Sequence, residues 1–367
     1  MRLCDGFAGH GNHVTVVYPY TYMRGNISSQ DIPSAYGLRN TVHRRLLLTP
    51  LLEKSPKLWR FIVLLIGFSF SAFRIAVEGI FLRRKTLILS RDAKALIPAI
   101  IFRKLLALFF NAKVIYIASE VKDRPIFKWV VKNSDGVIAG VTSTREAIQR
   151  LVPIEDKRFT LSLAPVPAPI VNCSKSEARK EIGYNSSSPL IVYTGKLGMD
   201  VNELKYIFTA ASMLPKYNFL FTGGRPSAVE SVKKYCFANG IDNVQFTGFF
   251  KDSTYVRYYQ LAADVLVSYY TAKDHLVDFN YPQKVNEYMT TGNVVVTPDF
   301  LATRDVVNEK NVIFVKPDCP EDLARGIKMA IENREQSEQL ARQALMDMRD
   351  LTFEKRTLDF LVFAEQL

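Results

Sequence analysis

A short segment in the second half of the chain combines residue types that suit binding of a phosphorylated ligand. Lys284 and Glu287 lie three residues apart within Asn280–Phe300, so in a helix they share one face. Pro282 suits the first turn of that helix, and an apolar strand is expected directly after it, at residues 294–297. A cation and a carboxylate near a helix start, at the carboxyl edge of a parallel sheet, suit a phosphate and a ribose. The alternative is an ordinary surface ion pair, and the surrounding elements must decide between the two.

Strands and helices alternate along most of the chain, which predicts parallel sheets covered on both faces. After a helical start at residues 1–11, the first half has expected strands at 13–18, 86–90, 113–117 and 136–139, and helices at 97–110 and 125–132. The second half has expected strands at 190–194, 217–222, 244–247, 264–268, 294–297 and 312–315, and helices at 201–213, 228–237, 254–261 and 320–333.

Three prolines at alternate positions, within residues 164–169, separate the two halves and favour an extended linker. A length of 367 residues allows two domains. We therefore expect an α/β fold with two doubly wound, Rossmann-like domains facing a cleft, over residues 1–165 and 166–350, and a C-terminal helix over 351–367. A doubly wound domain normally starts with a strand and a glycine-rich turn. The helical start therefore predicts that the first domain lacks its first strand.

The net charge of +12 favours anionic partners such as nucleotide phosphates, acidic lipid headgroups or nucleic acid. The basic residues form no stripe interleaved with aromatics, so nucleic acid is not expected. The four cysteines have no paired spacing, which predicts neither disulfides nor a zinc site and suits a cytoplasmic protein. No Asp-x-Asp pattern indicates a metal ion.

One apolar run, Phe61–Phe73, lies between Arg60 and Arg74, with Trp59 before it and the basic cluster at residues 83–85 after it. Its thirteen residues fall short of the roughly 18–20 that span a bilayer. It also starts too late for a signal peptide. Its flanks suit docking to an anionic membrane surface, and its composition equally suits a core helix of the first domain.

Four segments of the second half resemble, in their order and spacing, the GT-B glycosyltransferases, specifically the family-4-like retaining group. They are Ile191–Lys196 (IVYTGK), Phe219–Gly224 (FLFTGG), Asn243–Gly248 (NVQFTG) with the following Tyr258–Asp264, and the Pro282 helix, which is similar to the pattern "sPxKxxEYMAxG". Thr352, Phe353 and Arg356 resemble the closing "TWxxR" pattern, where the last helix usually crosses back to the first domain. The resemblance covers most of the chain and is strongest from Leu190 to Asp359.

The resemblance implies that a nucleotide-diphosphate sugar binds the second domain, with no cofactor or metal. The implied donor site is Gly195, Gly223, Gly224, Tyr281, Pro282, Lys284 and Glu287. Lys196, Lys284 and Glu287 are the candidate catalytic residues, since the lysines can stabilise a departing diphosphate and Glu287 can accept hydrogen bonds from ribose hydroxyls.

A saccharide or lipid-linked acceptor is implied to enter from the first domain. Arg91, Glu120 and Asp123 are the residues expected on that side. In the second domain, aromatic side chains are expected either against the base or sugar or in the core, namely Phe249, Tyr269, Tyr270 and Tyr281.

Three departures from the family pattern affect the predicted activity. Phe279 replaces the first of two glutamates, Asn202 and Glu203 stand where a second cation is common, and Ser119 stands near where a histidine is common. The expected function is sugar transfer in polysaccharide or glycolipid synthesis, with peripheral contact at the inner membrane surface. The alternatives are a degenerate binding or scaffold protein and a nucleotide-sugar epimerase of the same fold, although four histidines provide few acid–base groups for epimerisation.

Overall fold

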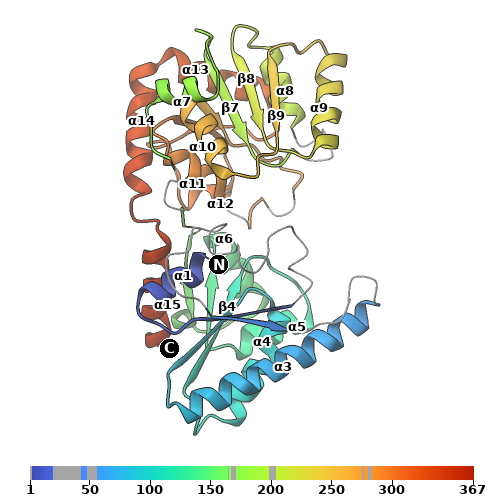
Figure 1. Cartoon of the computed structure of the whole chain (residues 1–367), viewed down its shortest axis with the longest axis vertical. Helices are drawn as coiled ribbons and strands as arrows, with labels where there is room; N and C mark the ends of the chain where they lie inside the picture. The colour runs from blue at the N-terminus through green and yellow to red at the C-terminus, as the bar shows by residue number, and fades with distance from the viewer. Residues whose placement is uncertain are drawn as a thin grey trace. The chain divides into compact units, whose positions relative to one another are not determined.

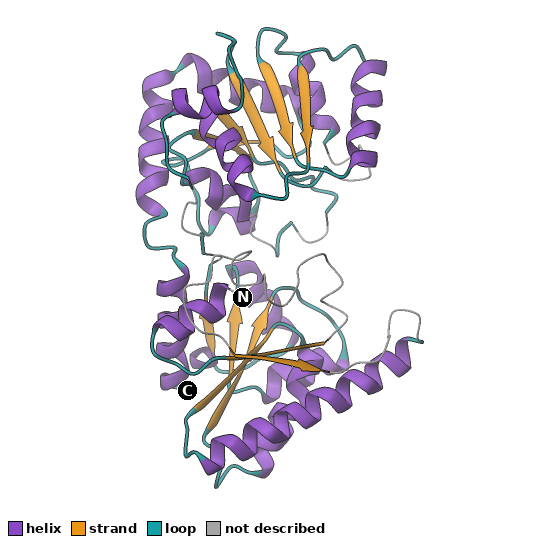
Figure 2. Ribbon diagram, in the orientation of Figure 1, coloured by secondary structure: helices purple, strands orange, loops and turns teal. Residues whose placement is uncertain are grey.

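The computed structural model describes residues 2–19, 43–47, 56–163, 165–166, 171–197, 204–274, 277–279 and 283–367. The chain divides into two compact units, Met1–Ser162 with Phe353–Leu367 (unit 1) and Leu163–Thr352 (unit 2). Each unit contains parallel strands flanked by helices, as Figure 2 shows. The predicted α/β fold class, with parallel sheets in both halves of the chain, is therefore confirmed.

Unit 1 has a four-stranded parallel sheet in the order β3-β4-β5-β6 and a separate two-stranded parallel sheet, β1-β2 (Figure 1). Its described elements are α1 (Arg2–Gly9), β1 (Thr15–Pro19), β2 (His43–Leu47), α3 (Lys57–Phe81), β3 (Thr86–Ser90), α4 (Ala93–Leu105), β4 (Ala112–Ala118), α5 (Pro125–Asn133), β5 (Gly136–Ala139), α6 (Thr142–Leu151), η2 (Asp156–Arg158), β6 (Phe159–Leu161) and α15 (Phe353–Gln366). In the four-stranded sheet, neighbouring strands are also consecutive in the sequence.

Alternation along β4 divides the core of unit 1 into two layers. Val114 and Tyr116 pack with α4 and α5, whereas Ile115 and Ile117 pack with α1 and α15. The helix α15 thus follows unit 2 in sequence but completes the core of unit 1.

Two contacts fix α15 on unit 1. Gly6 of α1 allows close approach, since a Cβ there would lie 2.9 Å from the Thr357 side chain. Arg356 donates to Ser162 Oγ at 2.9 Å and to Ser162 O at 3.2 Å, just after β6. Burial, and then the nearby positive charge of Arg91, lower the pKa of Arg356 to about 10. Arg356 of the closing pattern therefore has a structural role within unit 1.

The helix α3 is longer than the apolar run predicted from the sequence. It spans 25 residues, and its apolar part, Phe61–Phe81, is 21 residues long, so the thirteen residues counted up to Arg74 understated the length. Arg74 instead continues the helix through an i,i+4 ion pair with Glu78 at 3.0 Å. Within the described residues, α3 is the one helix long and apolar enough to cross a membrane by length and composition.

Unit 2 has a six-stranded parallel sheet in the order β12-β11-β10-β7-β8-β9. Its described elements are α7 (Lys175–Glu181), β7 (Leu190–Thr194), α8 (Lys205–Ser212), β8 (Asn218–Thr222), α9 (Pro226–Ala238), β9 (Val244–Gly248), α10 (Ser253–Ala262), β10 (Val265–Val267), α11 (Gln283–Met289), β11 (Val294–Pro298), α12 (Leu301–Arg304), β12 (Ile313–Val315), α13 (Pro320–Glu332) and α14 (Arg334–Asp347).

The strands of unit 2 are apolar on both faces, as expected for a parallel sheet covered by helices. Ile191 and Tyr193 of β7 face α8, α9 and α13, whereas Leu190 and Val192 face α7, α10 and α11. The strand order reverses between β7 and β10, so unit 2 is doubly wound.

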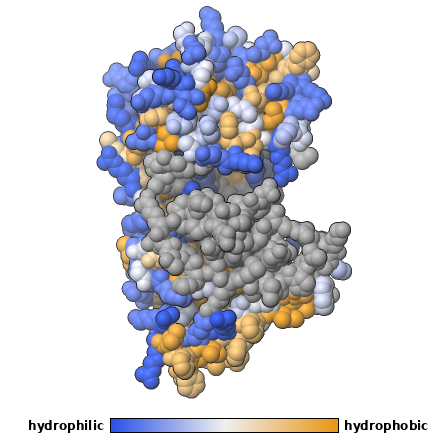
Figure 3. Space-filling model, viewed as in Figure 1, coloured by the Kyte–Doolittle hydropathy of each residue, from blue (hydrophilic) through white to orange (hydrophobic). Residues whose placement is uncertain are grey.

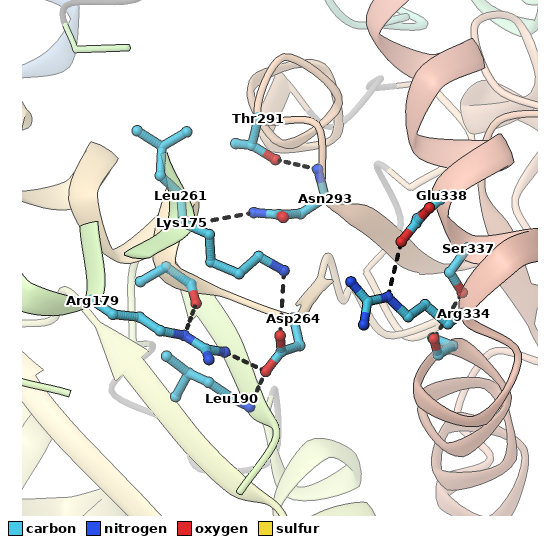
Figure 4. Close-up of polar contacts among 12 residues, drawn as sticks. Lys175, Arg179, Leu190, Leu261, Asp264, Thr291, Asn293, Arg334, Ser337 and Glu338 are labelled. Carbon is cyan, nitrogen blue, oxygen red and sulfur yellow. Dashed lines mark hydrogen bonds and ion pairs between the residues drawn. The ribbon is translucent and has the colours of Figure 1, made fainter. Parts of the chain in front are cut away.

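Asp264 joins three elements at the start of β10, and Figure 4 shows its contacts. Its carboxylate accepts from Leu190 N at 2.8 Å, from Arg179 at 2.5 Å and from Lys175 at 3.3 Å. Asp135, before β5 of unit 1, likewise accepts from the N–H of Val114 in the neighbouring strand. The segment Tyr258–Asp264, quoted above for its family resemblance, therefore ends in a structural anchor at the amino edge of the sheet.

We expect Asp264→Asn to lower the free energy of unfolding by about 2–3 kcal/mol. The substitution removes the charge that Arg179 and Lys175 share in a partly buried site. Urea denaturation measures the change. Glu230→Gln is the matched control, because it breaks only an exposed ion pair with Lys234 and should leave the midpoint unchanged. An Asp264→Asn midpoint equal to that of the control contradicts the anchoring role.

Candidate functional site

The carboxyl edge of the unit 2 sheet contains the candidate site. Ligands of open α/β sheets bind at this edge, where the strand order reverses. That position lies between β7 and β10. Residues 195–197 follow β7, and residues 268–270 follow β10. Residues 223–225 follow β8, the strand next to β7.

Two glycines let the turns after β7 and β8 approach each other. Gly195 has φ of 149° and Gly223 has φ of 120°, which side chains disfavour. A Cβ on Gly223 would lie 2.0 Å from Gly195 O, so the two backbones are in contact. Gly224 packs equally closely, because a Cβ there would lie 2.8 Å from the Leu197 side chain. The turns after β7 and β8 therefore lie in direct backbone contact at the end of β7.

The ammonium group of Lys284 occupies the space beside Gly195. A Cβ on Gly195 would lie 2.7 Å from Lys284 Nζ. Nζ lies 3.8 Å from the centre of the Tyr193 ring and 5.4 Å from that of Tyr270. Both distances suit cation–π attraction. Among the described residues no carboxylate forms an ion pair with Lys284, so its positive charge is held by ring faces.

The environment of Lys284 lowers the pKa of its ammonium below the usual lysine range. Burial is the main cause, since it removes water from the charged form. The electrostatic influence of Tyr270 and Glu287 acts in the opposite direction. A cation with reduced hydration is well placed to bind an anion, because less water has to be displaced.

Tyr288 fixes α11 to the end of β7. Its hydroxyl accepts from Thr194 N at 2.7 Å and donates to Thr194 O at 3.2 Å. Gln260 of α10 donates to Thr194 Oγ1 at 3.2 Å. Tyr288 is fully buried, one turn along α11 from Lys284. The position of Lys284 over Gly195 is therefore set by a buried polar network.

Arg257 of α10 holds the other end of α11. Its guanidinium donates to Thr290 O at 2.8 Å, to Thr290 Oγ1 at 3.0 Å and to Glu287 O at 3.3 Å. Burial lowers the pKa of Arg257, and the charge of Glu287 partly opposes that change. The partly buried Glu287 side chain thus lies in the field of two cations, Lys284 and Arg257.

The structure brings together five of the predicted donor-site residues at this edge. They are Gly195, Gly223, Gly224, Lys284 and Glu287. Lys196 is adjacent in sequence, and its exposed side chain has no hydrogen bond or ion pair with the described part of the chain. Tyr281 and Pro282 lie outside the described residues, as do Asn202 and Glu203.

The candidate aromatic residues occupy different environments. Tyr270 contacts the ammonium of Lys284. Tyr269 is buried and belongs to the core, where its hydroxyl donates to Asp318 Oδ1 at 3.3 Å and accepts from Asp318 N at 2.9 Å. Phe249 is exposed. Only Tyr270 among the described candidates contacts the predicted cation.

Sequence reasoning did not single out Tyr193, Gln260 or Arg257. A signal exists for Tyr193, because residues 193 and 195 lie on the same side of a strand. No signal links Gln260 and Arg257 to the site, since their partners lie on β7 and α11, far away in the sequence.

The residues predicted for the acceptor side lie in unit 1, after the carboxyl ends of β3 and β4. Arg91 follows β3 and is exposed. Glu120 pairs with Lys122, and Asp123 pairs with Lys128 at 2.7 Å. These are surface ion pairs, and their role stays a prediction. In the described residues no cluster of histidine, cysteine, aspartate and glutamate is arranged to hold a metal ion.

Residues 188–333 match the family model described as "Glycosyl transferases group 1". The matched segment runs from just before β7 to just after α13, so it contains the candidate site. No curated protein sequence matches the chain significantly.

Solved structures with the same fold include known glycosyltransferases. Sucrose-phosphate synthase (tll1590) from Thermosynechococcus elongatus matches all of this chain and 91% of its own, with 16% identity and a TM-score of 0.74. A glycosyltransferase from Rickettsia africae ESF-5 matches all of this chain and 93% of its own, with 13% identity and a TM-score of 0.76. Anabaena Alr3699/HepE in complex with UDP and glucose matches all of this chain and 95% of its own, with 14% identity and a TM-score of 0.72. The resemblance to GT-B glycosyltransferases is confirmed, and at these identities the structural likeness establishes the fold.

Proposed function

We propose that this chain, whose residues 188–333 match the glycosyl transferases group 1 model, transfers a sugar from a nucleotide-diphosphate sugar to an acceptor hydroxyl. We propose further that the sugar is a hexose, that the anomeric configuration is retained, and that the product is a polysaccharide or glycolipid. The acceptor is a saccharide or a lipid-linked saccharide, and the protein acts in the cytoplasm, at the inner membrane surface.

The observation that carries the proposal is the position of the Lys284 ammonium. It lies at the switch point of a doubly wound sheet, over a glycine and against two ring faces. The glycines at 195 and 223 let the turns after β7 and β8 lie directly beside the cation, without side chains of their own at these two positions. A diphosphate matches such a site because its charge is concentrated and its oxygens accept hydrogen bonds.

The chemistry places a specific demand on these residues. When the bond between the sugar and the diphosphate breaks, negative charge accumulates on the leaving phosphate. A preorganised cation stabilises that charge without reorganising at the moment of reaction. Lys284 is preorganised by the Tyr288 and Arg257 networks, and the exposed Lys196 can add a second cation. Glu287 can accept hydrogen bonds from the ribose hydroxyls.

The relatives give independent support for a nucleotide donor. The Anabaena protein has been solved with UDP, with UDP and glucose, and with UDP-glucose. We therefore place uridine nucleotides first among the donors to test.

The test measures donor binding and product formation on the same protein. Calorimetry with UDP and GDP reports the affinity, and labelled UDP- and GDP-sugars with a panel of saccharide acceptors report transfer. Transfer with the donor's anomeric configuration in the product supports the proposal. Nucleotide binding without turnover supports the binding or scaffold alternative, for which the absence of a carboxylate at Phe279 is the specific observation. Interconversion of the donor sugars without an acceptor supports the epimerase.

Donor affinity should depend on pH through Lys284. Only the protonated amine attracts the diphosphate, and its pKa is lowered in the folded protein. We therefore expect the affinity for UDP to fall with rising pH, beginning below the pH at which an ordinary lysine deprotonates. Calorimetric titrations between about pH 7 and 10 measure this dependence. Lys284→Arg stays charged over this range and should remove the fall; an identical pH profile in that variant excludes Lys284 as its source.

A further inference from the structure

The helix α3 has an exposed apolar face that the donor site does not explain. Phe70 is 68% exposed and Phe81 is 85% exposed. The exposed apolar residues of α3 are Trp59, Ile62, Ile66, Phe70, Phe73, Val77 and Phe81. Figure 3 shows hydrophobic atoms along the lower edge of unit 1, where α3 runs in Figure 1.

The spacing of these seven residues defines a straight stripe. Positions 59, 62, 66 and 70 are repeated eleven residues later as 70, 73, 77 and 81. At about 100° per residue, all seven lie within about 100° of one another around the helix. An eleven-residue repeat drifts by about 20° per repeat, less per residue than a heptad seam and in the opposite sense. The stripe therefore extends along one side of the helix for about 33 Å, at 1.5 Å per residue.

A different side of α3, centred about 120° around the helix from the stripe, is packed on unit 1. Ala72 and Ala76 are buried with α4 and its following turn, and a Cβ on Gly79 would lie 2.6 Å from the Phe110 ring. Phe73 also contacts Phe102 of α4, with ring centres 5.8 Å apart. The helix is thus packed on the unit through Ala72, Ala76 and Gly79, and the stripe is exposed except at Phe73, which is half-covered by α4.

Positive charge is concentrated around this helix. Residues 57–113 contain eleven lysines and arginines and two acidic residues, so they account for nine of the twelve net positive charges of the chain. The exposed cluster Arg83, Arg84 and Lys85 follows α3 directly. Further exposed apolar residues, Leu105, Leu108 and Phe109, lie at the end of α4 and just after it.

The exposed side chains of the stripe present roughly 700 Å² of apolar surface, taking about 150–200 Å² for each fully exposed large side chain. The largest patch on a typical monomer is about 300–600 Å². A surface of this size, flanked by basic residues and beginning at a tryptophan, has the character of a helix that lies in a membrane interface.

We propose that α3 docks this protein on an anionic lipid bilayer, with its axis in the plane of the membrane and the Trp59–Phe81 stripe in the boundary between headgroups and acyl chains. The exposed cluster Arg83, Arg84 and Lys85 contacts the acidic headgroups. The packing of Ala72, Ala76 and Gly79 on unit 1 favours this orientation over a spanning one, because a spanning helix would have to leave those contacts. The inference does not depend on the donor site.

Vesicle flotation of the full chain tests the proposal. With vesicles of 70% phosphatidylcholine and 30% phosphatidylglycerol, we expect the protein to float, and with phosphatidylcholine alone to stay at the bottom. Ile66→Glu with Phe70→Glu should lower the vesicle affinity at least tenfold, because it places charge in the centre of the stripe. Replacing Arg83, Arg84 and Lys85 by glutamine should lower it about fivefold for each charge and reduce its salt dependence.

Phe237→Glu is the matched control, since Phe237 is 88% exposed but lies on α9 of unit 2. It should float as the unsubstituted protein does. Equal flotation of the stripe variant and this control overturns the proposal. A second result also overturns the proposal. If the unsubstituted protein sediments as a dimer and does not bind vesicles, and the stripe variant sediments as a monomer, a second copy of the chain covers the stripe.

Tryptophan fluorescence is a second measurement, and it does not require introducing charged residues into the stripe. The chain has two tryptophans, Trp59 and Trp129, so Trp129→Phe leaves Trp59 as the only reporter. Its emission should shift to the blue on addition of anionic vesicles and be quenched by lipids brominated near the headgroup. Maximal quenching by lipids brominated at the chain ends, together with resistance to alkaline extraction, indicates a spanning helix and overturns the in-plane orientation.

Discussion

We expect Lys284→Met to lose most of the proposed transfer activity, with kcat lowered about 100- to 1,000-fold. Methionine keeps much of the volume of the lysine side chain and its contact with the Tyr193 ring, so the loss comes from the charge. In the free protein the ammonium has no ion pair among the described residues, and ring faces hold it at the end of β7. The Lys284 ammonium is therefore available to stabilise the negative charge that develops on a leaving diphosphate.

The same variant should bind UDP at least tenfold more weakly, because the ground-state diphosphate also carries charge. A kcat loss larger than the affinity loss indicates that Lys284 acts mainly in the transition state. Lys251→Met is the matched control, since Lys251 is an exposed lysine of unit 2 and should change neither quantity. If Lys284→Met retains full activity, the diphosphate does not contact this cation.

Much of the fold was predictable because parallel strands have a strong local signal. The expected strands at 86–90, 136–139 and 190–194 coincide with β3, β5 and β7, each a short apolar run between polar turns. The elements that the prediction missed have weak signals. The strand β2 (His43–Leu47) contains two arginines, and α14 (Arg334–Asp347) is mainly polar. Such elements form because the tertiary structure supplies the partners.

The candidate site was predictable in its residues but not in its geometry. Lys284 and Gly195 were singled out on residue type and pattern, which do not show that the ammonium lies where a Cβ of Gly195 would be. The residues that position Lys284 were harder to predict, because Arg257 lies on α10 and its hydrogen bonds to the end of α11 have no signal in the sequence. The apolar stripe of α3 was missed for a third reason. The order of apolar residues in the sequence does not show which side of the helix is covered, whereas the burial of Ala72 and Ala76 in the structure does.

Gly195→Ala is the sharpest test of the contact between the β7 turn and α11. The new methyl group would lie 2.7 Å from Lys284 Nζ, and the flexible end of a lysine moves readily. We expect the ammonium to leave the Tyr193 ring, and the affinity for UDP to fall about 10- to 100-fold, which corresponds to about 1.4–2.8 kcal/mol. The backbone at φ of 149° also disfavours alanine, at a cost of about 1–3 kcal/mol in stability.

Two other glycines separate these effects. Gly240→Ala introduces a side chain at φ of 63° with open space around it, so it should cost about 1–2 kcal/mol in stability and leave UDP affinity unchanged. Gly223→Ala would place a methyl group 2.0 Å from Gly195 O, and a backbone atom cannot move aside as a side chain does. It should therefore destabilise unit 2 more than either of the others, as thermal unfolding would show. If Gly195→Ala instead binds UDP as Gly240→Ala does, the bare turn serves only the fold, because moving the cation then has no consequence for the ligand.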